Sequence, residues 1–338
     1  MENEIKTFVS YRLPGKQDFT TLASSKEAFI DNEVDLTSDN TFFVTSFDKK
    51  VVFHIQPEVK LTNEFVYCDF QLNNSPKQTR KTAHAHQVEA IKRKIQSGEF
   101  DKVVLSRIKL AKKPEDFDPH IYFQRLCNQY PDAFVYMLYS ELSGLWIGAS
   151  PELLIKKQHD SYNTVALAGT RLISEPWTPK EEVEQQFVTD FIVGSIKEKS
   201  KKLEVSPKKD KVIGSIKHLM TNIVFEPYLE VEINRILQDI QPTPAVCGIP
   251  QQESMDYLKN LESHTRSFYA GAIGPVGIND ETALYVNLRC LQVCKNDLAL
   301  YLGGGITADS IAKDEWIETE RKGKILLRFL SNNSIEEE

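Results

Sequence analysis

Three strand-like segments follow one another between residues 132 and 168 without a helix between them. They span 132–140, 144–149 and 162–168, and each is short and apolar. Parallel strands need a long crossover, usually a helix, so strands this close along the chain should pair antiparallel. We expect helices over 84–97, 118–130 and 180–203 and near the C-terminus, and further strands over 102–110, 267–276, 283–294 and 297–302. This order predicts an α+β fold with large, mostly antiparallel sheets packed with helices.

The first 80 residues differ from the rest of the chain. Short apolar runs (FFVTSF, VVFHI and FVYCDF) alternate with polar turns, a pattern typical of strands. A polar segment, 73–86, follows, which we interpret as a loop and not as a domain boundary. We therefore expect a single domain over 1–338, with a variable strand-rich part at 1–80 and a denser, more regular part at 85–330.

The C-terminal segment combines a glycine run with a charged helix. Gly303, Gly304 and Gly305 precede a helix on which Glu315, Glu318 and Lys322 are spaced i, i+3 and i+7 and so share one face. The same face continues with Ile325, Leu326 and Phe329, so we expect it to run from a polar cleft into a core. Two acids and a lysine in a cleft suit a hard metal ion and an anionic ligand. A solvated charged face with ordinary i,i+4 pairs is the alternative.

A second helix, 180–196, carries another pair of acids. Glu184 precedes Phe187, Val188 and Phe191 at i+3, i+4 and i+7, so it should lie within an apolar stripe. An unpartnered buried carboxylate is costly, so a cation should meet it or the helix end should open into a cleft. Glu181 lies one turn earlier. Two Glu-x-x-Glu pairs without His or Cys favour Mg²⁺ over zinc, although acids near a helix N-terminus also favour the helix dipole.

Composition excludes several classes of protein. The net charge of −7 and the lack of basic runs argue against nucleic acid as a partner. The five cysteines are scattered, without a Cys-x-x-Cys pair, which argues against a disulfide framework or structural zinc. The N-terminus lacks a signal-peptide core, and no apolar run reaches membrane-spanning length. We expect a cytoplasmic protein that binds no membrane.

Nine short motifs then occur in order along residues 85–330. They are KVVLSR (102–107), GASPELL (148–154), LAGTR (167–171), KEEVE (180–184), KHLMT (217–221), PTPAVCG (242–248), FYAGAIGPVG (268–277), LRC (288–290) and GGGI…EWIETERK (303–322). Together they resemble the chorismate-utilising enzymes, and within these the isochorismate synthases. The resemblance implies the fold of that family, chorismate as substrate, Mg²⁺ as cofactor and no obligatory protein partner.

The resemblance also implies an acid and a base. Lys102 matches the general base that deprotonates water as it adds to C2 of chorismate, and Glu152 matches the general acid that protonates the departing C4 hydroxyl. Lys102 then has to be neutral for part of the cycle, and the pKa of Glu152 should be raised. Each role is typically worth about 10²–10⁴ in rate. Without the resemblance, Lys102 would be expected on the surface, and Ser150 and Pro151 could form a capped turn.

The remaining implied residues bind metal and substrate. Glu184 and Glu318 match metal ligands, and Glu181 and Glu315 match their supporting carboxylates. The expected substrate-binding residues are Gly169, Thr170, His218, Tyr269, Arg289, Gly305 and Lys322; of these, Tyr269 and Arg289 match the pair that holds the enolpyruvyl carboxylate. This chain departs from the family at Gln185 and Gln241, where histidine is common.

Two alternative functions stay open. Salicylate synthases share the lysine and the acids and go on to eliminate pyruvate. A non-catalytic chorismate-binding protein could keep the same fold. Lys102 together with Ala245 favours water over an amine or ammonia as nucleophile. The sequence leaves open whether the product serves menaquinone or siderophore synthesis.

Overall fold

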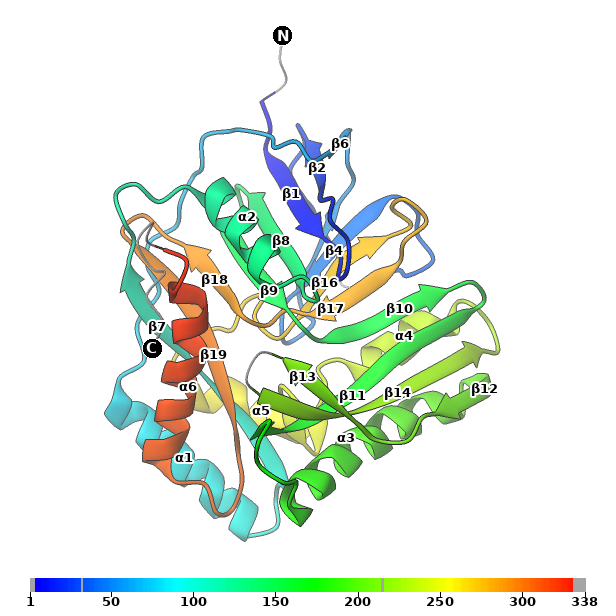
Figure 1. Ribbon diagram of the computed structural model, residues 1–338, viewed down its shortest axis with the longest axis vertical. Coiled ribbons are helices and arrows are strands. Elements are labelled where there is room, and N and C mark those ends of the chain that lie inside the picture. Colours follow the sequence, from blue (N-terminus) through cyan, green and yellow to red (C-terminus); the bar gives the residue numbers. More distant parts are fainter. Residues whose placement is uncertain (1–3, 32, 214–215, 331–338) are drawn as a thin grey trace.

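The computed structural model describes residues 4–31, 33–213 and 216–330, and within them nineteen strands form two antiparallel sheets (Figure 1). Sheet A has the strand order β15 (Gly248–Ile249), β7 (Lys102–Lys112), β19 (Asp297–Ile306), β18 (Cys290–Val293), β9 (Gly144–Ser150), β8 (Phe134–Ser140), β1 (Thr7–Arg12), β2 (Thr20–Ser24) and β6 (Val59–Thr62). Sheet B has the order β12 (Ser200–Val205), β14 (Ile216–Pro227), β11 (Ser161–Leu172), β10 (Leu153–Gln158), β17 (Ala283–Val286), β16 (Ala272–Val276), β4 (Thr41–Thr45), β5 (Val52–Ile55) and β3 (Phe29–Asp31), and β13 (Lys209–Ile213) pairs with β14. The predicted α+β fold with antiparallel sheets is confirmed.

The helices lie against the sheets and against one another. They are α1 (Lys81–Gln96), α2 (Pro119–Gln129), α3 (Pro179–Lys197), α4 (Glu232–Ile240), α5 (Gln251–Leu261) and α6 (Ala312–Leu327). Helix α3 packs on β11 and β14 of sheet B, whereas α6 packs on β19 of sheet A and beside α1 (Figure 1). The helix carrying Glu184 and the helix carrying Glu318 therefore belong to different sheets. None of the helices in the described part is long and apolar enough to cross a membrane.

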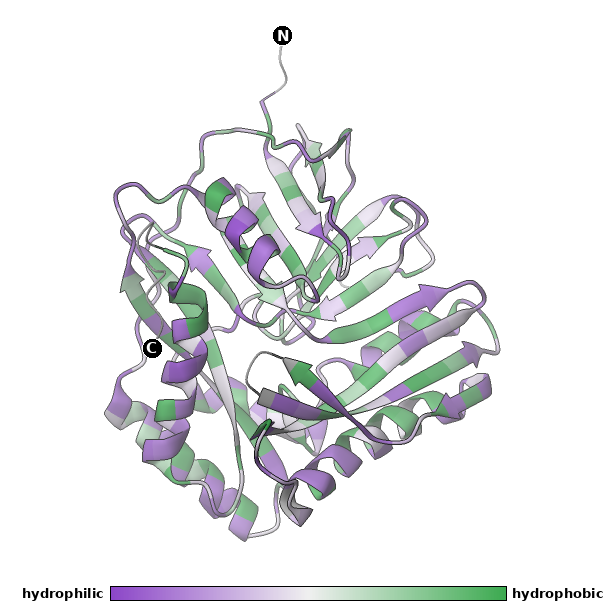
Figure 2. Ribbon diagram, viewed as in Figure 1, coloured by the Kyte–Doolittle hydropathy of each residue, from purple (hydrophilic) through white to green (hydrophobic). Residues whose placement is uncertain are grey.

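The N-terminal strands are built into both sheets. Strand β1 pairs with β8 in sheet A, and β4 pairs with β16 in sheet B. The part of the chain without family motifs thus shares its backbone hydrogen bonds with the part that has them. Apolar residues follow the strands of both sheets, while α3 and α6 alternate apolar and polar segments (Figure 2).

The core has two parts. A large cluster lies between the sheets and under α1, α3, α4 and α5, and includes Phe42, Phe134, Ile192, Phe225 and Ile236. A smaller cluster covers the other face of sheet A under α2 and α6 and includes Phe123, Ile147 and Leu326. Sheet A is therefore buried on both faces, which explains why β8 and β9 are nearly continuous apolar runs.

Several expected boundaries were wrong. The helix expected over 180–203 ends at Lys197, because 200–205 pairs with β14 as strand β12. The expected strand 283–294 is interrupted at 287–289, where Arg289 has a φ of 47°. The possible capped turn after Ser150 is instead a short link from β9 to β10. Each correction reflects pairing with a distant strand, which local propensity does not encode.

Substitution of Gly271, which lies against β4, tests how closely the N-terminal strands pack against the rest of the chain. A Cβ at Gly271 would lie 1.9 Å from the carbonyl oxygen of Thr45. Gly271→Ala should therefore force the backbone apart and lower the free energy of unfolding by about 3 kcal/mol or more, measured by urea denaturation. Gly194→Ala is the matched control, because Gly194 lies in α3 with nothing within 4 Å of its Cβ position. That variant should be about 0.5–1 kcal/mol more stable, and equal effects of the two substitutions would contradict the close approach.

Candidate active site

Lys102 is the first residue of β7, and it is buried. Only 8% of the residue is exposed, and its ammonium forms a hydrogen-bonded ion pair with the carboxylate of Glu184 on α3. The expectation that a cation meets Glu184 is confirmed, and that cation is a lysine of this chain. The stem of Lys102 passes Gly305 on β19, where a Cβ would lie 3.0 Å from Lys102 Cε. Any side chain at residue 305 would displace the lysine.

Glu152 lies in the link between β9 and β10 and is 6% exposed. Burial raises the pKa of its carboxyl to about 7, although the positive charge of Lys102 and the hydroxyl of Thr243 both act to lower it. The Thr243 Oγ1 to Glu152 Oε1 distance is 3.5 Å. The pKa of Glu152 is thus raised, as expected for a general acid at neutral pH, because a charged carboxylate is poorly solvated there.

The glycine run of β19 forms the middle of the site. A Cβ at Gly303 would lie 2.6 Å from the hydroxyl of Tyr269, and one at Gly304 would lie 3.5 Å from Glu315 Oε2. Tyr269 is buried, and its ring stacks on Tyr301 with 6.0 Å between centroids. Three consecutive glycines therefore allow Tyr269, Glu315 and Lys102 to approach one strand.

Helix α6 turns its predicted polar face toward this strand. The Lys322 ammonium donates to the carbonyl of Gly303 at 2.9 Å and pairs with Glu318 at 2.7 Å. The hydroxyl of Ser310 donates to Glu315 Oε1 at 2.6 Å. Glu318 and Lys322 are each about half exposed, at 51% and 46% of the side chain, so they lie at the rim of the site.

On α3, Glu181 has a clear structural role. Its carboxylate accepts from the Thr178 backbone at 3.0 Å and from the Thr178 hydroxyl in a capping box, and it lies 3.4 Å from the Arg171 guanidinium. Partial burial acts to raise the pKa of the Glu181 carboxyl, but these hydrogen bonds and the charge of Arg171 outweigh it, so the pKa of Glu181 is lowered. A Cβ at Gly169 would lie 3.1 Å from Glu181 Cβ, which places the LAGTR segment against the start of α3. The side chain of Thr170 lies outside the described part of the chain.

The expected apolar stripe around Glu184 was partly wrong. The face of α3 that is buried is formed by Gln185, Val188, Thr189, Ile192 and Ile196. Phe187 is 43% exposed, so Glu184 lies at the edge of the buried face. Gln185 and Gln241, the departures from the family pattern, are both buried and donate to threonine hydroxyls.

His218 on β14 contacts the LAGTR segment of the neighbouring strand β11. Its Nδ1 lies 3.0 Å from the carbonyl oxygen of Gly169. Burial lowers the pKa of His218, the charges of Arg289 and Lys322 lower it further, and the charge of Glu184 raises it.

Arg289 sits in the link between β17 and β18, and burial lowers the pKa of its guanidinium. Among the described residues, no hydrogen bond or ion pair joins it to Tyr269 or to a carboxylate. A partly buried arginine without a protein anion suits a carboxylate ligand, to which its planar fork can donate two hydrogen bonds.

Four glutamates were expected around Mg²⁺. Within the described ranges, no three acidic, histidine or cysteine side chains form a group that could hold a metal ion. The donor chemistry nevertheless fits a hard cation, because α3 and α6 both bring a carboxylate to β19: Glu184 reaches Lys102 beside Gly305, and Glu315 lies against Gly304. A bound divalent ion would compete with Lys102 for Glu184 and with Lys322 for Glu318.

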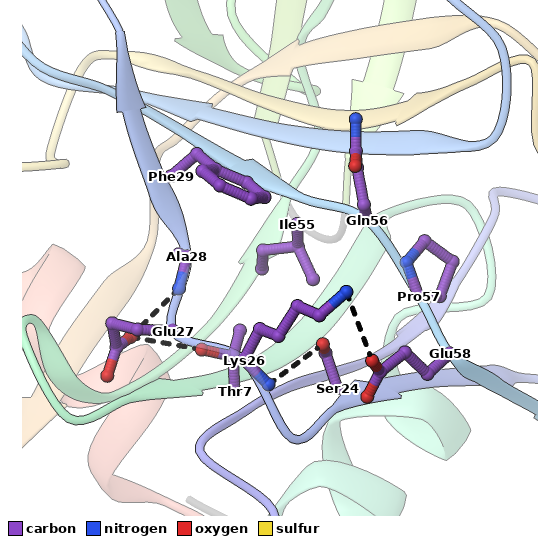
Figure 3. Close-up of a pocket in the computed structure, with 10 residues that line it drawn as sticks. All are labelled: Thr7, Ser24, Lys26, Glu27, Ala28, Phe29, Ile55, Gln56, Pro57 and Glu58. Carbon is purple, nitrogen blue, oxygen red and sulfur yellow. Dashed lines mark hydrogen bonds and ion pairs between the residues drawn. The ribbon is translucent and has the colours of Figure 1, made fainter.

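Some functional candidates were missed from the sequence. Thr243 stood in a quoted motif, PTPAVCG, but only the fold shows that its hydroxyl faces Glu152. A cavity of about 160 Å³ lies elsewhere, lined by residues such as Ser24, Lys26, Phe29 and Glu58 of the N-terminal strands and loops, and it contains no predicted site residue (Figure 3).

The sequence is similar to those of several named enzymes. Isochorismate synthase 2, chloroplastic, of Arabidopsis thaliana is 31% identical over 70% of this chain and 44% of its own length. Anthranilate synthase component 1 of Neisseria gonorrhoeae is 29% identical over 57% of this chain and 43% of its own. The chain spans 44–62% of the first curated relatives that it matches.

Structural similarity extends further than sequence similarity. The structure of MenF, the menaquinone-specific isochorismate synthase from Escherichia coli, superimposes with a TM-score of 0.82 at 19% identity, over 98% of this chain and 90% of that one. This likeness concerns the fold and includes the N-terminal strands. Residues 57–331 match the family described as chorismate binding enzyme. The chain therefore belongs to the chorismate-binding enzyme family.

Proposed function

We propose that this protein isomerises chorismate to isochorismate. The observation that carries the proposal is that Lys102 and Glu152 are both buried and that the positive charge of Lys102 acts on the Glu152 carboxyl, whose pKa burial raises to about 7. A carboxylic acid that keeps its proton near neutrality, together with a buried lysine as potential base, suits a reaction that adds water at one carbon and loses a hydroxyl group as water at another.

The two residues would act on different atoms. Lys102 leaves its ion pair with Glu184, loses one ammonium proton to solvent and, as a neutral amine, accepts a proton from the water that adds to C2 of the ring. Glu152 donates its proton to the C4 hydroxyl, which departs as water. One water enters and one leaves, so the product is an isomer of the substrate. Each proton transfer would lower the barrier by roughly 3–5 kcal/mol.

The substrate is a dianion in a protein of net charge −7, so local cations have to bind it. Arg289, with Tyr269 nearby on the adjoining turn, would hold the enolpyruvyl carboxylate, and Lys322 would lie near the ring carboxylate. Glu184 and Glu318 would hold Mg²⁺, supported by Glu181 and Glu315. When bound, the ion would supply Lewis-acid stabilisation of charge on the ring carboxylate.

Product analysis tests the proposal. Purified protein is incubated with chorismate with and without Mg²⁺, products are separated by chromatography and pyruvate is assayed. We expect isochorismate without pyruvate, and only with the metal. Salicylate with stoichiometric pyruvate would support a salicylate synthase instead, anthranilate in the presence of ammonia would support the chemistry of the other relative, and unchanged chorismate would support a binding protein.

Lys102→Ala should reduce kcat by at least about 10² while chorismate affinity stays within a few-fold, because the base acts in the transition state. Turnover and binding are measured separately, by product formation and by calorimetry. Lys94→Ala is a control, since Lys94 forms an exposed ion pair with Glu99. Wild-type turnover in Lys102→Ala would refute the assignment of the base.

Glu152 should make stability depend on pH. Its folded-state pKa of about 7 exceeds the ordinary value of 4.5, so the stability it contributes is complete below about pH 4.5 and is lost as the pH rises to about 7. The difference in the free energy of unfolding between Glu152→Gln and wild type should therefore rise, in favour of the variant, by about 2–3 kcal/mol from about pH 5 to about pH 8. Urea denaturation at both pH values measures this. Glu253→Gln, an exposed carboxylate on α5, should show no such change, and a parallel pH profile for Glu152→Gln would contradict the raised pKa.

Glu318→Gln should weaken Mg²⁺ binding by at least about tenfold, because one carboxylate charge leaves the proposed ligand set. Isothermal titration of the protein with Mg²⁺ alone gives a readout independent of turnover. Glu253→Gln again serves as control. Unchanged Mg²⁺ affinity, or full activity in excess chelator, would show that the metal assignment is wrong.

A further inference from the structure

Arg266 is a charged residue buried beneath the candidate site, with 3% of its surface exposed. Its Nε and Nη2 donate to both carboxylate oxygens of Glu262 at 2.9 and 2.6 Å, and the side chain of Glu262 is also 3% exposed. The guanidinium carbon lies 4.1 Å from the centre of the Phe47 ring. This bidentate pair is strong and geometrically specific, but burying two charges seldom adds net stability.

The same guanidinium also donates to two backbone carbonyls on separate segments. Nη2 donates to Val104 of β7 at 2.6 Å, and Nη1 donates to Val246 of the 242–248 segment at 2.8 Å. Its own backbone carbonyl accepts from the N–H of Tyr269 at 3.0 Å. Glu262 in turn accepts from the N–H of Ser106, two residues further along β7, at 2.8 Å.

The segments that meet at Arg266 each carry part of the proposed chemistry. Strand β7 begins with Lys102, and the 242–248 segment carries Thr243, whose hydroxyl faces Glu152. The backbone also joins these two segments: the N–H of Val104 donates to the carbonyl of Cys247 at 2.7 Å, and Gly248 and Ile249 pair with Val103 and Lys102 of β7. Arg266 adds a side-chain link between β7 and Val246, which lies closer in sequence to Thr243 than the backbone pairing does.

We propose that Arg266 is a positioning residue that holds Lys102 and the Thr243–Glu152 contact at a fixed separation. This inference rests on the proposed function, since the separation matters only if both residues act on one substrate. Arginine is needed because its planar fork can bind two carbonyls and a carboxylate at once, while a lysine ammonium presents three donors at one point.

Arg266→Lys tests this proposal because it keeps the charge and loses the fork. We expect kcat to fall about 100-fold with KM within about threefold, since a displacement near 1 Å costs this much in rate without removing a substrate contact. The alkaline limb of the pH–rate profile should move upward, because separating Glu152 from Thr243 and from the Lys102 charge raises the pKa of Glu152.

Arg12→Lys is the matched control. Arg12 is also buried, at 4% exposed, and donates to several backbone carbonyls, among them Pro131 at 3.1 Å and Ala133 at 3.0 Å, but it lies on β1. The Arg12→Lys variant should lose about as much stability as Arg266→Lys, without a change in kcat or in the pH–rate profile. Equal kinetic effects in the two variants, or an unchanged kcat in Arg266→Lys, would overturn the proposal.

Cys247 provides a readout that needs no turnover. It is fully buried in the 242–248 segment, and burial raises the pKa of its thiol to about 12. Arg266→Lys should increase the rate at which iodoacetamide alkylates Cys247 by about tenfold or more, because the 242–248 segment loosens, and Arg12→Lys should not. The alkylated residue is located by peptide mass.

The labelling experiment also separates this proposal from the proposed function. If the wild type makes no isochorismate, the proposed function fails, and Cys247 labelling still decides whether Arg266 holds the segment. If Arg266→Lys does not fold, Glu262→Gln is measured in the same way. We expect a smaller loss in kcat than for Arg266→Lys, and faster Cys247 labelling than in the wild type. A Glu262→Gln variant with the kcat and the labelling rate of the wild type would overturn the proposal.

Discussion

Strand β19 passes through the candidate site as bare backbone at Gly303, Gly304 and Gly305, and the arrangement around it depends on those missing side chains. The strand is paired with β7 along ten residues, from Asp297 to Ile306, so its position is held by the sheet and not by the site. Because no Cβ is present, the hydroxyl of Tyr269 can approach Gly303 and the stem of Lys102 can approach Gly305, while Glu315 lies beside Gly304. A methyl group at Gly303 or Gly305 would crowd the tyrosine hydroxyl or the lysine stem.

Charge in this site is balanced locally. The buried lysine and the half-exposed lysine each pair with a glutamate, Lys102 with Glu184 and Lys322 with Glu318. Burying an ion without such a partner would cost several kcal/mol. No ion pair reaches Glu152 within the described ranges, and its raised pKa lets it stay neutral instead. If Glu184 and Glu318 hold Mg²⁺ as proposed, the ion and the lysines are alternative partners for these carboxylates, so metal binding would be linked to release of Lys102.

The sequence was informative where periodicity and spacing matched the final packing. The shared face of Glu315, Glu318 and Lys322 and the antiparallel order of the strands followed from residue spacing alone. It was misleading at α3, where a helix was expected to continue to residue 203. The segment 200–205 pairs with β14 instead, and such pairing depends on a strand about twenty residues away in sequence. The sequence was also misleading at Lys102. Lysines are usually exposed, but Lys102 is buried because β7 lies inside sheet A and Gly305 leaves room for the lysine stem.

The amino-acid sequence by itself determined the fold class, the family resemblance and the types of group available for chemistry, because local spacing and motif order are carried by the chain. Only the tertiary structure decided which groups meet. Lys102 pairs with Glu184 from 82 residues away, and Arg266 reaches Val104 across 162 residues. Contacts of this kind depend on how the two sheets and their helices pack, and the free energy of that packing is shared among many residues and is not encoded in any one motif.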